Sequence, residues 1–351
     1  MHGILHPAKL QNFDTWQRDR FADYGGSDRK DGLIAPDGAL YLIKYAENHT
    51  RKNELDTSYV NNALSEYLSS HILGIIGYDV HETLLGTRNN EIIVACKNFV
   101  PENQKLIEFG RYLRKHYDSG ELGRVPEIGQ IKDTLREDED LSPVSEQLWE
   151  SYCCRFVGDA FVGNFDRHMG NWGYLVSRTD PVRPSPIYDN GSTLFPALSE
   201  HAMKTDILPN EKEILKRTLL FPKAALIVHG QKVSYYDMLC SDFEPQITKA
   251  VLDIVPVIKD RFPEINRFID EQEFLSDVRK TFYKTMLAAR YYFLLEPAWE
   301  ICAEQKFSRS AGERLEKGIP YTEEMFERDY QKMMADEGWK IRDRKYQKAV
   351  I

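Results

Sequence analysis

The sequence has few cysteines and no long apolar run. Its 351 residues include five cysteines, an odd count with one adjacent pair, Cys153 and Cys154. That arrangement predicts neither a disulfide framework nor a zinc site. No apolar stretch approaches the roughly 20 residues that span a bilayer, and the first residues lack the basic segment and apolar core of a secretory signal. We therefore expect no membrane span and a reducing, cytoplasmic setting.

Positive charges are outnumbered by negative ones. The chain has 46 Lys and Arg against 55 Asp and Glu, a formal net charge of −9. This balance argues against nonspecific binding to nucleic acid or anionic membranes as the main task, although a local basic site for a polyanion is compatible with it. Internal repeats and low-complexity linkers are also lacking. The 42% hydrophobic and 12% aromatic fractions predict a folded chain, long enough for two lobes with separate cores.

Two short motifs stand out in the middle of the chain. GNFDRHMGNWGYLV, residues 163–176, places Asp166 five positions before Asn171 in a Gly-rich loop that leads into a short apolar strand. PIYDNGSTL, residues 186–194, places Asp189 after a second short segment. Phosphoryl-transfer enzymes use such a set: one Asp near the attacking hydroxyl, and an Asn and a second Asp that hold magnesium against the triphosphate. By itself the pattern is also compatible with ordinary turns, because Asp, Asn and Gly are turn formers.

Residues before position 50 add a possible phosphate site. Gly25, Gly26 and Ser27 begin a turn, and small residues there let backbone N–H groups approach phosphate oxygens. A hairpin follows, and Lys44 is the lone charge in its apolar second strand, while Lys30 adds positive charge near the loop. Taken alone, Gly25 and Gly26 are better explained by an ordinary surface turn. For Lys44 the alternative is an exposed strand lysine, against which stands its place as the lone charge of the strand.

A helix and a buried strand complete this first part. Residues 57–76 have helical spacing, and Glu66 among them is a candidate partner for Lys44. A solvent-facing helix glutamate is the alternative. Residues 91–99 predict a buried strand, which in a two-lobed kinase leads to the hinge. The backbone groups expected at the adenine edge belong to Cys96, Lys97 and Asn98.

The remaining residues are mainly helical by pattern. Residues 142–165 predict a buried helix that carries the chain directly into Asp166, and residues 243–304 predict further helices. A hairpin is expected at residues 224–233. The charged end, residues 321–350, is expected to form one peripheral helix or a frayed tail. Residues 195–222 have no interpretable pattern.

Taken in order, these motifs resemble the HipA-like serine/threonine kinases, especially the compact CtkA-like branch. The pair DRHMGNWG and IYDNGSTL is the most specific match, and the resemblance runs roughly from residue 22 to residue 300. It implies an α+β, two-lobed protein-kinase-like fold, with a small β-rich N-lobe with one main helix at residues 1–100 and a mostly α-helical C-lobe at residues 101–351. It also implies transfer of the γ-phosphate of ATP, with Mg²⁺, to serine or threonine hydroxyls of protein substrates.

The resemblance also implies roles for single residues. Asp166 would orient the substrate hydroxyl, and Asn171 and Asp189 would bind magnesium. Lys44 would pair with the phosphates and be held by Glu66. In this family a serine of the glycine loop can be autophosphorylated, and Ser27 is the candidate here. His168 would brace the catalytic loop.

Some features depart from related kinases. This chain has D-R-H where eukaryotic protein kinases have H-R-D, and Asp189-Asn190-Gly191 where they have D-F-G. Only about two dozen residues precede the glycine loop, whereas full-length HipA toxins carry an additional subdomain there. This argues against a HipA-type toxin docked to its repressor. It leaves room for a stand-alone kinase, an effector, or a toxin whose missing subdomain is a separate chain. A separate antitoxin or regulatory chain is then a possible partner.

Two other functions stay open at this point. Similar D-R-H-x-x-N loops occur in phosphatidylinositol kinases, so the same fold would serve a transferase acting on a lipid or small molecule, or one transferring a nucleotide. A nucleotide-binding pseudokinase is the other alternative. The intact set of Lys44, Asp166, Asn171 and Asp189 argues against it, because loss of one such residue is the usual mark of an inactive site.

Overall fold

The computed structural model describes residues 10–19, 30–46, 62–118, 120 and 122–350. The predicted glycine loop, Gly25 to Ser27, lies outside the described residues. The chain divides into two compact units. The first consists of Met1–Pro101, Pro186–Pro209 and Pro263–Tyr283, and the second of Glu102–Ser185, Asn210–Phe262 and Lys284–Ile351. The predicted lobe boundary at residue 100 stays a prediction.

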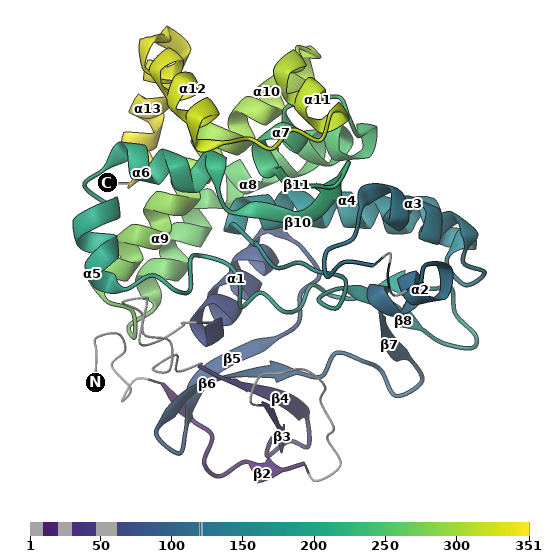
Figure 1. Ribbon diagram of the computed structural model, residues 1–351. Helices are drawn as coiled ribbons and strands as arrows, with labels where there is room; N and C mark the ends of the chain where they lie inside the picture. Colours follow the sequence, from purple (N-terminus) through teal and green to yellow (C-terminus); the bar gives the residue numbers. More distant parts are fainter. Residues whose placement is uncertain (1–9, 20–29, 47–61, 119, 121, 351) are drawn as a thin grey trace. The chain divides into compact units, whose positions relative to one another are not determined.

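A six-stranded sheet dominates the first unit (Figure 1), in the order β1-β5-β6-β4-β3-β2. Every neighbouring pair is antiparallel except β1 and β5. The predicted hairpin is confirmed, and its turn is closed by a hydrogen bond from Gly38 N–H to the Ala35 carbonyl. The strands are β1 (Gln11–Asn12), β2 (Gln17–Arg18), β3 (Lys30–Ile34), β4 (Leu40–Tyr45), β5 (Thr83–Arg88) and β6 (Glu91–Lys97).

The two faces of this sheet differ in chemistry. One face packs an apolar core in which Tyr41, Ile43 and Tyr45 of β4 meet Phe13 and other buried residues. Since side chains alternate along a strand, Lys44 projects from the opposite face. Helix α1 (Asn62–Ile76) contacts β5 and β6 and supplies Glu66 to Lys44 on that face. The alternating side chains of β4 therefore place the apolar core and the charged group on opposite faces of the sheet.

The second unit is mostly helical. It contains a three-stranded sheet in the order β7-β8-β9 and the predicted hairpin, β10 with β11. The strands are β7 (Lys105–Glu108), β8 (Gly173–Val176), β9 (Arg183–Pro184), β10 (Lys223–Val228) and β11 (Gln231–Ser234). Its helices are α2 (Phe109–His116), α3 (Ile128–Glu137), α4 (Ser145–Val162), α6 (Glu211–Leu215), α7 (Tyr235–Leu239), α10 (Glu296–Glu304), α11 (Arg309–Glu316), α12 (Glu323–Ala335) and α13 (Glu337–Val350).

Besides α1, three further α-helices of the described chain contribute residues to the first unit. Helices α8 (Pro245–Glu271) and α9 (Asp277–Arg290) each contribute residues to both units, and α5 (Glu200–Ala202) belongs to the first. The helices predicted over residues 243–304 are thereby confirmed, as is the α+β class with a β-rich and a helical part. None of the helices in the described part of the chain is long and apolar enough to cross a bilayer.

The C-terminal segment differs from its prediction of one helix or a frayed tail. It forms two helices, α12 and α13, separated at Asp336, whose extended backbone ends α12. Phe326 is fully buried, and Trp339 stacks on Phe293 with ring centroids 4.3 Å apart. The charged composition concealed these aromatic contacts. They fix α13 against the helical turn Tyr291–Leu295, because burying a large ring removes much apolar area from water.

Candidate active site

Lys44 is the centre of a partly buried charged group in the first unit. Its ammonium nitrogen lies 2.8 Å from Glu66 Oε2 and 2.8 Å from Asp189 Oδ1. Glu66 is buried, whereas the side chain of Asp189 is 36% exposed. Lys30 lies directly opposite Lys44 in the β3–β4 pairing, so both lysines belong to the same face of the sheet. The sheet thus presents two cations where the sequence predicted phosphate binding.

The charges of this group stabilise one another. Burial alone would lower the pKa of Lys44, but Glu66 and Asp189 outweigh it and raise that pKa well above its usual value. Burial alone would raise the pKa of Glu66, but Lys44 and a hydrogen bond from His81 hold it well below the usual range. Both side chains are therefore charged at neutral pH. Each stabilises the charge of the other, which burial alone would disfavour.

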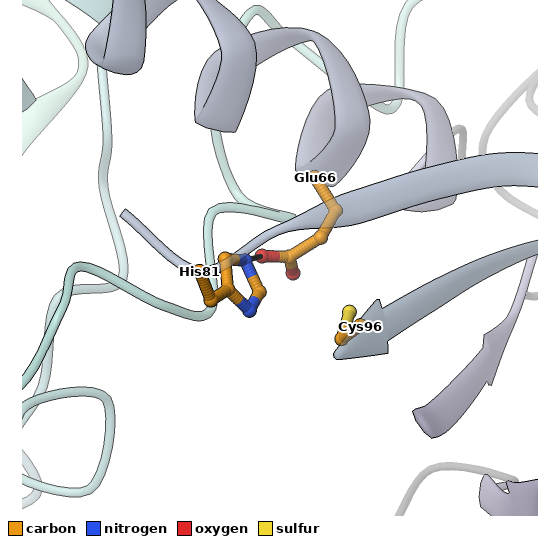
Figure 2. Close-up of side chains that lie close together, drawn as sticks. All are labelled: Glu66, His81 and Cys96. Atoms are coloured by element: carbon orange, nitrogen blue, oxygen red, sulfur yellow. Dashed lines mark hydrogen bonds and ion pairs between the residues drawn. The ribbon is translucent and has the colours of Figure 1, made fainter. Parts of the chain in front are cut away.

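The second oxygen of Glu66 is held by two groups that the sequence did not indicate as its partners. His81 Nε2 lies 3.0 Å from Glu66 Oε1 (Figure 2). The Asn190 N–H donates to the same oxygen at 2.7 Å. Ser70 Oγ connects them, at 3.1 Å from His81 Nε2 and 2.9 Å from Asn190 Nδ2. The glutamate is thus fixed on both oxygens and tied to the residue after Asp189.

Figure 2 also shows Cys96 near Glu66 and His81, and the three carry ligand types found at metal sites. Their ligand atoms lie within 4.8 Å of one another and all three residues are buried. Glu66, however, already binds Lys44 and Asn190, and burial raises the pKa of the Cys96 thiol, which keeps it protonated. We therefore interpret the three residues as part of the support of Lys44.

The backbone around Asp189 is fixed by residues 79–81. The Ile187 N–H donates to the Asp79 carbonyl at 2.8 Å, and the His81 N–H donates to the Ile187 carbonyl at 3.1 Å. Asp189 itself has a φ of 59°, a left-handed conformation that Asp tolerates better than most residues. Thr193 Oγ1 then donates to the Asn190 carbonyl at 2.7 Å. These contacts hold the segment that places the Asp189 carboxylate against Lys44.

The predicted adenine edge lies at the end of β6. The Lys97 N–H donates to the Glu82 carbonyl at 2.9 Å, and the Asn98 N–H donates to the Leu40 carbonyl at 2.8 Å. Both N–H groups are therefore engaged in the sheet. Contacts of these two residues with an adenine edge would use their carbonyl oxygens.

In the second unit, the loop predicted to be catalytic begins where α4 ends. Gly163 closes the helix with a φ of 69°, which glycine adopts without strain. Asn164 then bridges the helix and the loop, because its Nδ2 donates to Asp159 Oδ1 at 3.0 Å and its Oδ1 accepts from the Asp166 N–H at 3.0 Å. The helix predicted from the sequence thus delivers Asp166 through a hydrogen-bonded turn.

Arg167 closes the other side of this loop. It forms a fork with Asp159, with Nη2 2.9 Å from Oδ1 and Nε 3.0 Å from Oδ2, and Nη1 donates to the Asn171 carbonyl at 3.1 Å. Asn171 Nδ2 in turn donates to the Asp166 carbonyl at 2.8 Å. Gly173 then enters β8, where a Cβ would meet the Ile107 carbonyl at 2.2 Å. A direct hydrogen bond between Asn171 and Asp166, which stand five positions apart, therefore closes the loop.

Two side chains approach the Asp166 carboxylate, whose side chain is 28% exposed. The exposed Arg124 donates to Oδ2 at 2.9 Å, and His168 Nε2 lies 4.0 Å from the same oxygen. The Gly170 N–H donates to His168 Nδ1 at 3.0 Å. When the ring is neutral, its hydrogen is therefore on Nε2, the nitrogen nearer Asp166.

The structure brings the predicted residues together in two groups. Lys44, Glu66 and Asp189 meet in the first unit, and Asp166 and Asn171 in the second. Several residues that hold these two groups by hydrogen bonds or ion pairs were not predicted from the sequence. Two of them could have been noticed there: Asp159 is a lone carboxylate in a strongly apolar helix segment, and His81 lies shortly before a strand. The missed supports are Ser70, His81, Arg124, Asp159 and Asn164.

Comparison with known proteins agrees with this geometry, although no family model matches the chain. The serine/threonine-protein kinase CtkA of Helicobacter pylori is 30% identical over 279 residues, which cover 78% of this chain and 83% of that protein. A crystal structure of a proinflammatory kinase CtkA from Helicobacter pylori superposes with a TM-score of 0.77 at 29% identity, covering 86% of this chain and all of that one.

A more distant structure shares the fold. In a complex of the Shewanella oneidensis toxin–antitoxin proteins HipA and HipB with operator DNA, the matching chain gives a TM-score of 0.53 at 13% identity, covering 85% of this chain and 70% of that one. At this identity the likeness concerns the fold. From the CtkA relatives it follows that this chain belongs to the CtkA family of serine/threonine-protein kinases.

Proposed function

We propose that the chain transfers the γ-phosphate of ATP to serine or threonine hydroxyls of a protein, with Lys44, Asp166, Asn171 and Asp189 as its catalytic residues. The observation that carries this proposal is the buried pair of Lys44 and Glu66. A lysine fixed in this way by a helix glutamate is the arrangement with which kinases hold the phosphates of ATP. Family membership supports the same activity.

Asp166 would orient the acceptor hydroxyl. Its backbone is held on both sides, by Asn164 at the N–H and by Asn171 at the carbonyl, while its carboxylate is partly exposed. A fixed backbone with an accessible carboxylate is what positioning an acceptor requires, and positioning accounts for much of the rate in phosphoryl transfer. The hydroxyl proton would pass to a carboxylate oxygen of Asp166.

Asn171 and Asp189 would hold Mg²⁺. Magnesium prefers hard oxygen ligands, and these residues offer an amide oxygen and a carboxylate. Asn171 uses its amide nitrogen to bind the Asp166 carbonyl, and its Oδ1 makes no hydrogen bond within the described chain. The chemistry of both side chains therefore fits the ion, which when bound neutralises charge on the phosphates.

The rest of the nucleotide site is proposed by resemblance. Gly25, Gly26 and Ser27 would cover the phosphates, with Lys30 beside them and Ser27 open to autophosphorylation. Cys96, Lys97 and Asn98 would line the adenine, and His168 would support the phosphate side of the catalytic loop. A separate antitoxin or regulatory chain and a cytoplasmic setting stay predictions.

The test is transfer of labelled γ-phosphate from Mg-ATP to the protein itself and to a generic protein acceptor. Wild type is compared with Asp166→Asn, which keeps the size of the side chain, and with Asp180→Asn, which removes a charge from an exposed loop of the same unit. We expect transfer by wild type and Asp180→Asn and at least a 100-fold loss for Asp166→Asn.

Nucleotide binding separates loss of catalysis from loss of folding. Asp166→Asn should still bind Mg-ATP, measured by calorimetry, because Lys44 and Asp189 are unchanged. Equal transfer by Asp166→Asn and wild type would disprove the role of Asp166. Transfer of label only from the α-phosphate would instead show a nucleotidyl transferase.

A further inference from the structure

A small cavity lies beside α4 in the second unit. Its lining includes Tyr152, Arg155, Asp159 and Arg167, together with Tyr235 and residues 224–226 of β10. It has room for about one water-sized particle. Its size restricts a ligand to a water molecule or a monatomic ion.

The surroundings of this cavity carry an excess of buried positive charge. Arg155, Arg167 and Arg290 are 6%, 5% and 2% exposed. Arg290 belongs to the group because its guanidinium lies 5.6 Å from the ring centre of Tyr235. Asp159 forms its fork with Arg167, whereas Arg290 donates to the Arg217 carbonyl at 3.0 Å. Two guanidinium groups, those of Arg155 and Arg167, therefore line the cavity together with the single carboxylate of Asp159.

Arg155 is the cation left without a polar partner. Within the described chain its guanidinium makes no hydrogen bond or ion pair, and it packs on the rings of Trp172, 4.6 Å away, and Tyr152, 5.3 Å away. Asp159 lies four residues after Arg155 on α4, the spacing at which oppositely charged side chains of a helix can pair. Its carboxylate, however, accepts hydrogen bonds from Arg167 and Asn164. A buried charge without a counter-ion is costly.

We propose that this cavity binds a monatomic anion such as chloride, with the Arg155 guanidinium as its main donor. The Tyr152 hydroxyl, which has no hydrogen-bond partner among the described residues, is a second donor. The pairing of β10 with β11 is irregular between Lys223 and Ile227, beside the cavity. A site rich in donors and in positive charge selects an anion over water.

The anion would also support the loop proposed to be catalytic. With Arg155 neutralised by an anion, Asp159 stays with Arg167, and Arg167 keeps its bond to the Asn171 carbonyl. Without an anion, Arg155 competes for the Asp159 carboxylate. This link to catalysis rests on the proposed function, whereas anion binding itself does not.

Thermal unfolding of the full chain tests the site without any activity assay. Wild type is compared in chloride, bromide and gluconate salts of potassium at equal ionic strength. We expect chloride and bromide to raise Tm saturably by about 2–4 °C over gluconate. Arg155→Met should abolish this difference, and Arg136→Met, which removes an exposed guanidinium from α3, should retain it. Equal Tm values for wild type in all three salts would overturn the proposal.

Crystals grown in bromide give an independent answer, including the case in which Arg155→Met does not fold. An anomalous bromide peak within contact distance of the Arg155 guanidinium is expected in the wild-type protein. A water molecule at that position in bromide crystals would overturn the proposal, since it would show that the cavity prefers a neutral occupant.

Discussion

His81 Nε2 lies 3.0 Å from Glu66 Oε1, so an imidazole supports the carboxylate whose other oxygen binds Lys44. The two residues come from different elements, Glu66 from α1 and His81 from the segment before β5. Ser70 and the backbone of Asn190 complete the support. The orientation of Lys44 therefore depends on His81, which acts on the lysine through Glu66.

Replacing His81 should lower catalysis without unfolding the protein. We expect His81→Ala to reduce kcat/KM for ATP about 10-fold, because a hydrogen bond to a buried charged group is lost. His81→Gln should recover part of this loss, since its amide can donate to Glu66. The exposed His201→Ala is the control and should match wild type. A matched loss in Ala and Gln variants with a large fall in Tm would indicate a purely structural role.

Lys44→Met should remove the proposed phosphate contact. We expect a fall in kcat/KM of about 100- to 1,000-fold, as for loss of one preorganised group that stabilises charge in a transition state. Lys306→Met, in an exposed loop of the second unit with a side chain 76% exposed, removes an equal charge and should change kcat/KM less than about threefold. Steady-state kinetics with saturating protein acceptor measures both. Comparable losses in the two variants would contradict the assignment of Lys44.

Arg124→Ala should raise activity slightly. The guanidinium occupies Asp166 Oδ2, an oxygen that an acceptor hydroxyl would use, but the arginine side chain is 72% exposed. Exposed ion pairs contribute about 0–1 kcal/mol, so kcat/KM for the protein acceptor should rise by up to about fivefold. The gain should shrink at high salt, where the wild-type pair is screened. A 10-fold loss of activity would instead assign Arg124 to acceptor binding.

Asp159→Asn should destabilise the second unit. The change leaves the buried Arg167 without its counter-charge, and such losses cost about 3–5 kcal/mol in the free energy of unfolding. Urea unfolding monitored by fluorescence measures the change. The exposed Asp180→Asn should alter the same free energy by less than about 0.5 kcal/mol. Equal stabilities would mean that Asp159 does not hold the loop.

Acid should reveal the contribution of Glu66 to stability. Its pKa is lower in the folded chain than the ordinary value of 4.5, so the folded state binds fewer protons than the unfolded state. The stabilisation is therefore fully present above about pH 4.5 and is lost as pH falls toward the folded pKa. Urea unfolding at a series of pH values should show a shallower acid loss for Glu66→Gln than for wild type. Parallel curves would contradict this prediction.

Local patterns in the sequence predicted much of the fold and part of the site. The turn before Leu40 predicted the hairpin, and helical spacing around Glu66 and before Asp166 predicted α1 and α4. The pairing of Lys44 with Glu66 was also expected, and the structure shows it. These features could be inferred because strand alternation, helical periodicity and turn residues are all local properties of the chain.

The tertiary structure decided the contacts between residues distant in sequence. The order of residues does not show that the Asn190 N–H binds Glu66, 124 positions away. It also does not show that the N–H groups of Lys97 and Asn98 donate hydrogen bonds to backbone carbonyls of residues that lie beside them in the fold. The same holds for Arg155, whose natural helical partner is taken by Arg167 from the following loop. Sequence spacing proposes which side chains can meet, whereas burial and competition for a limited number of carboxylates determine which of them do.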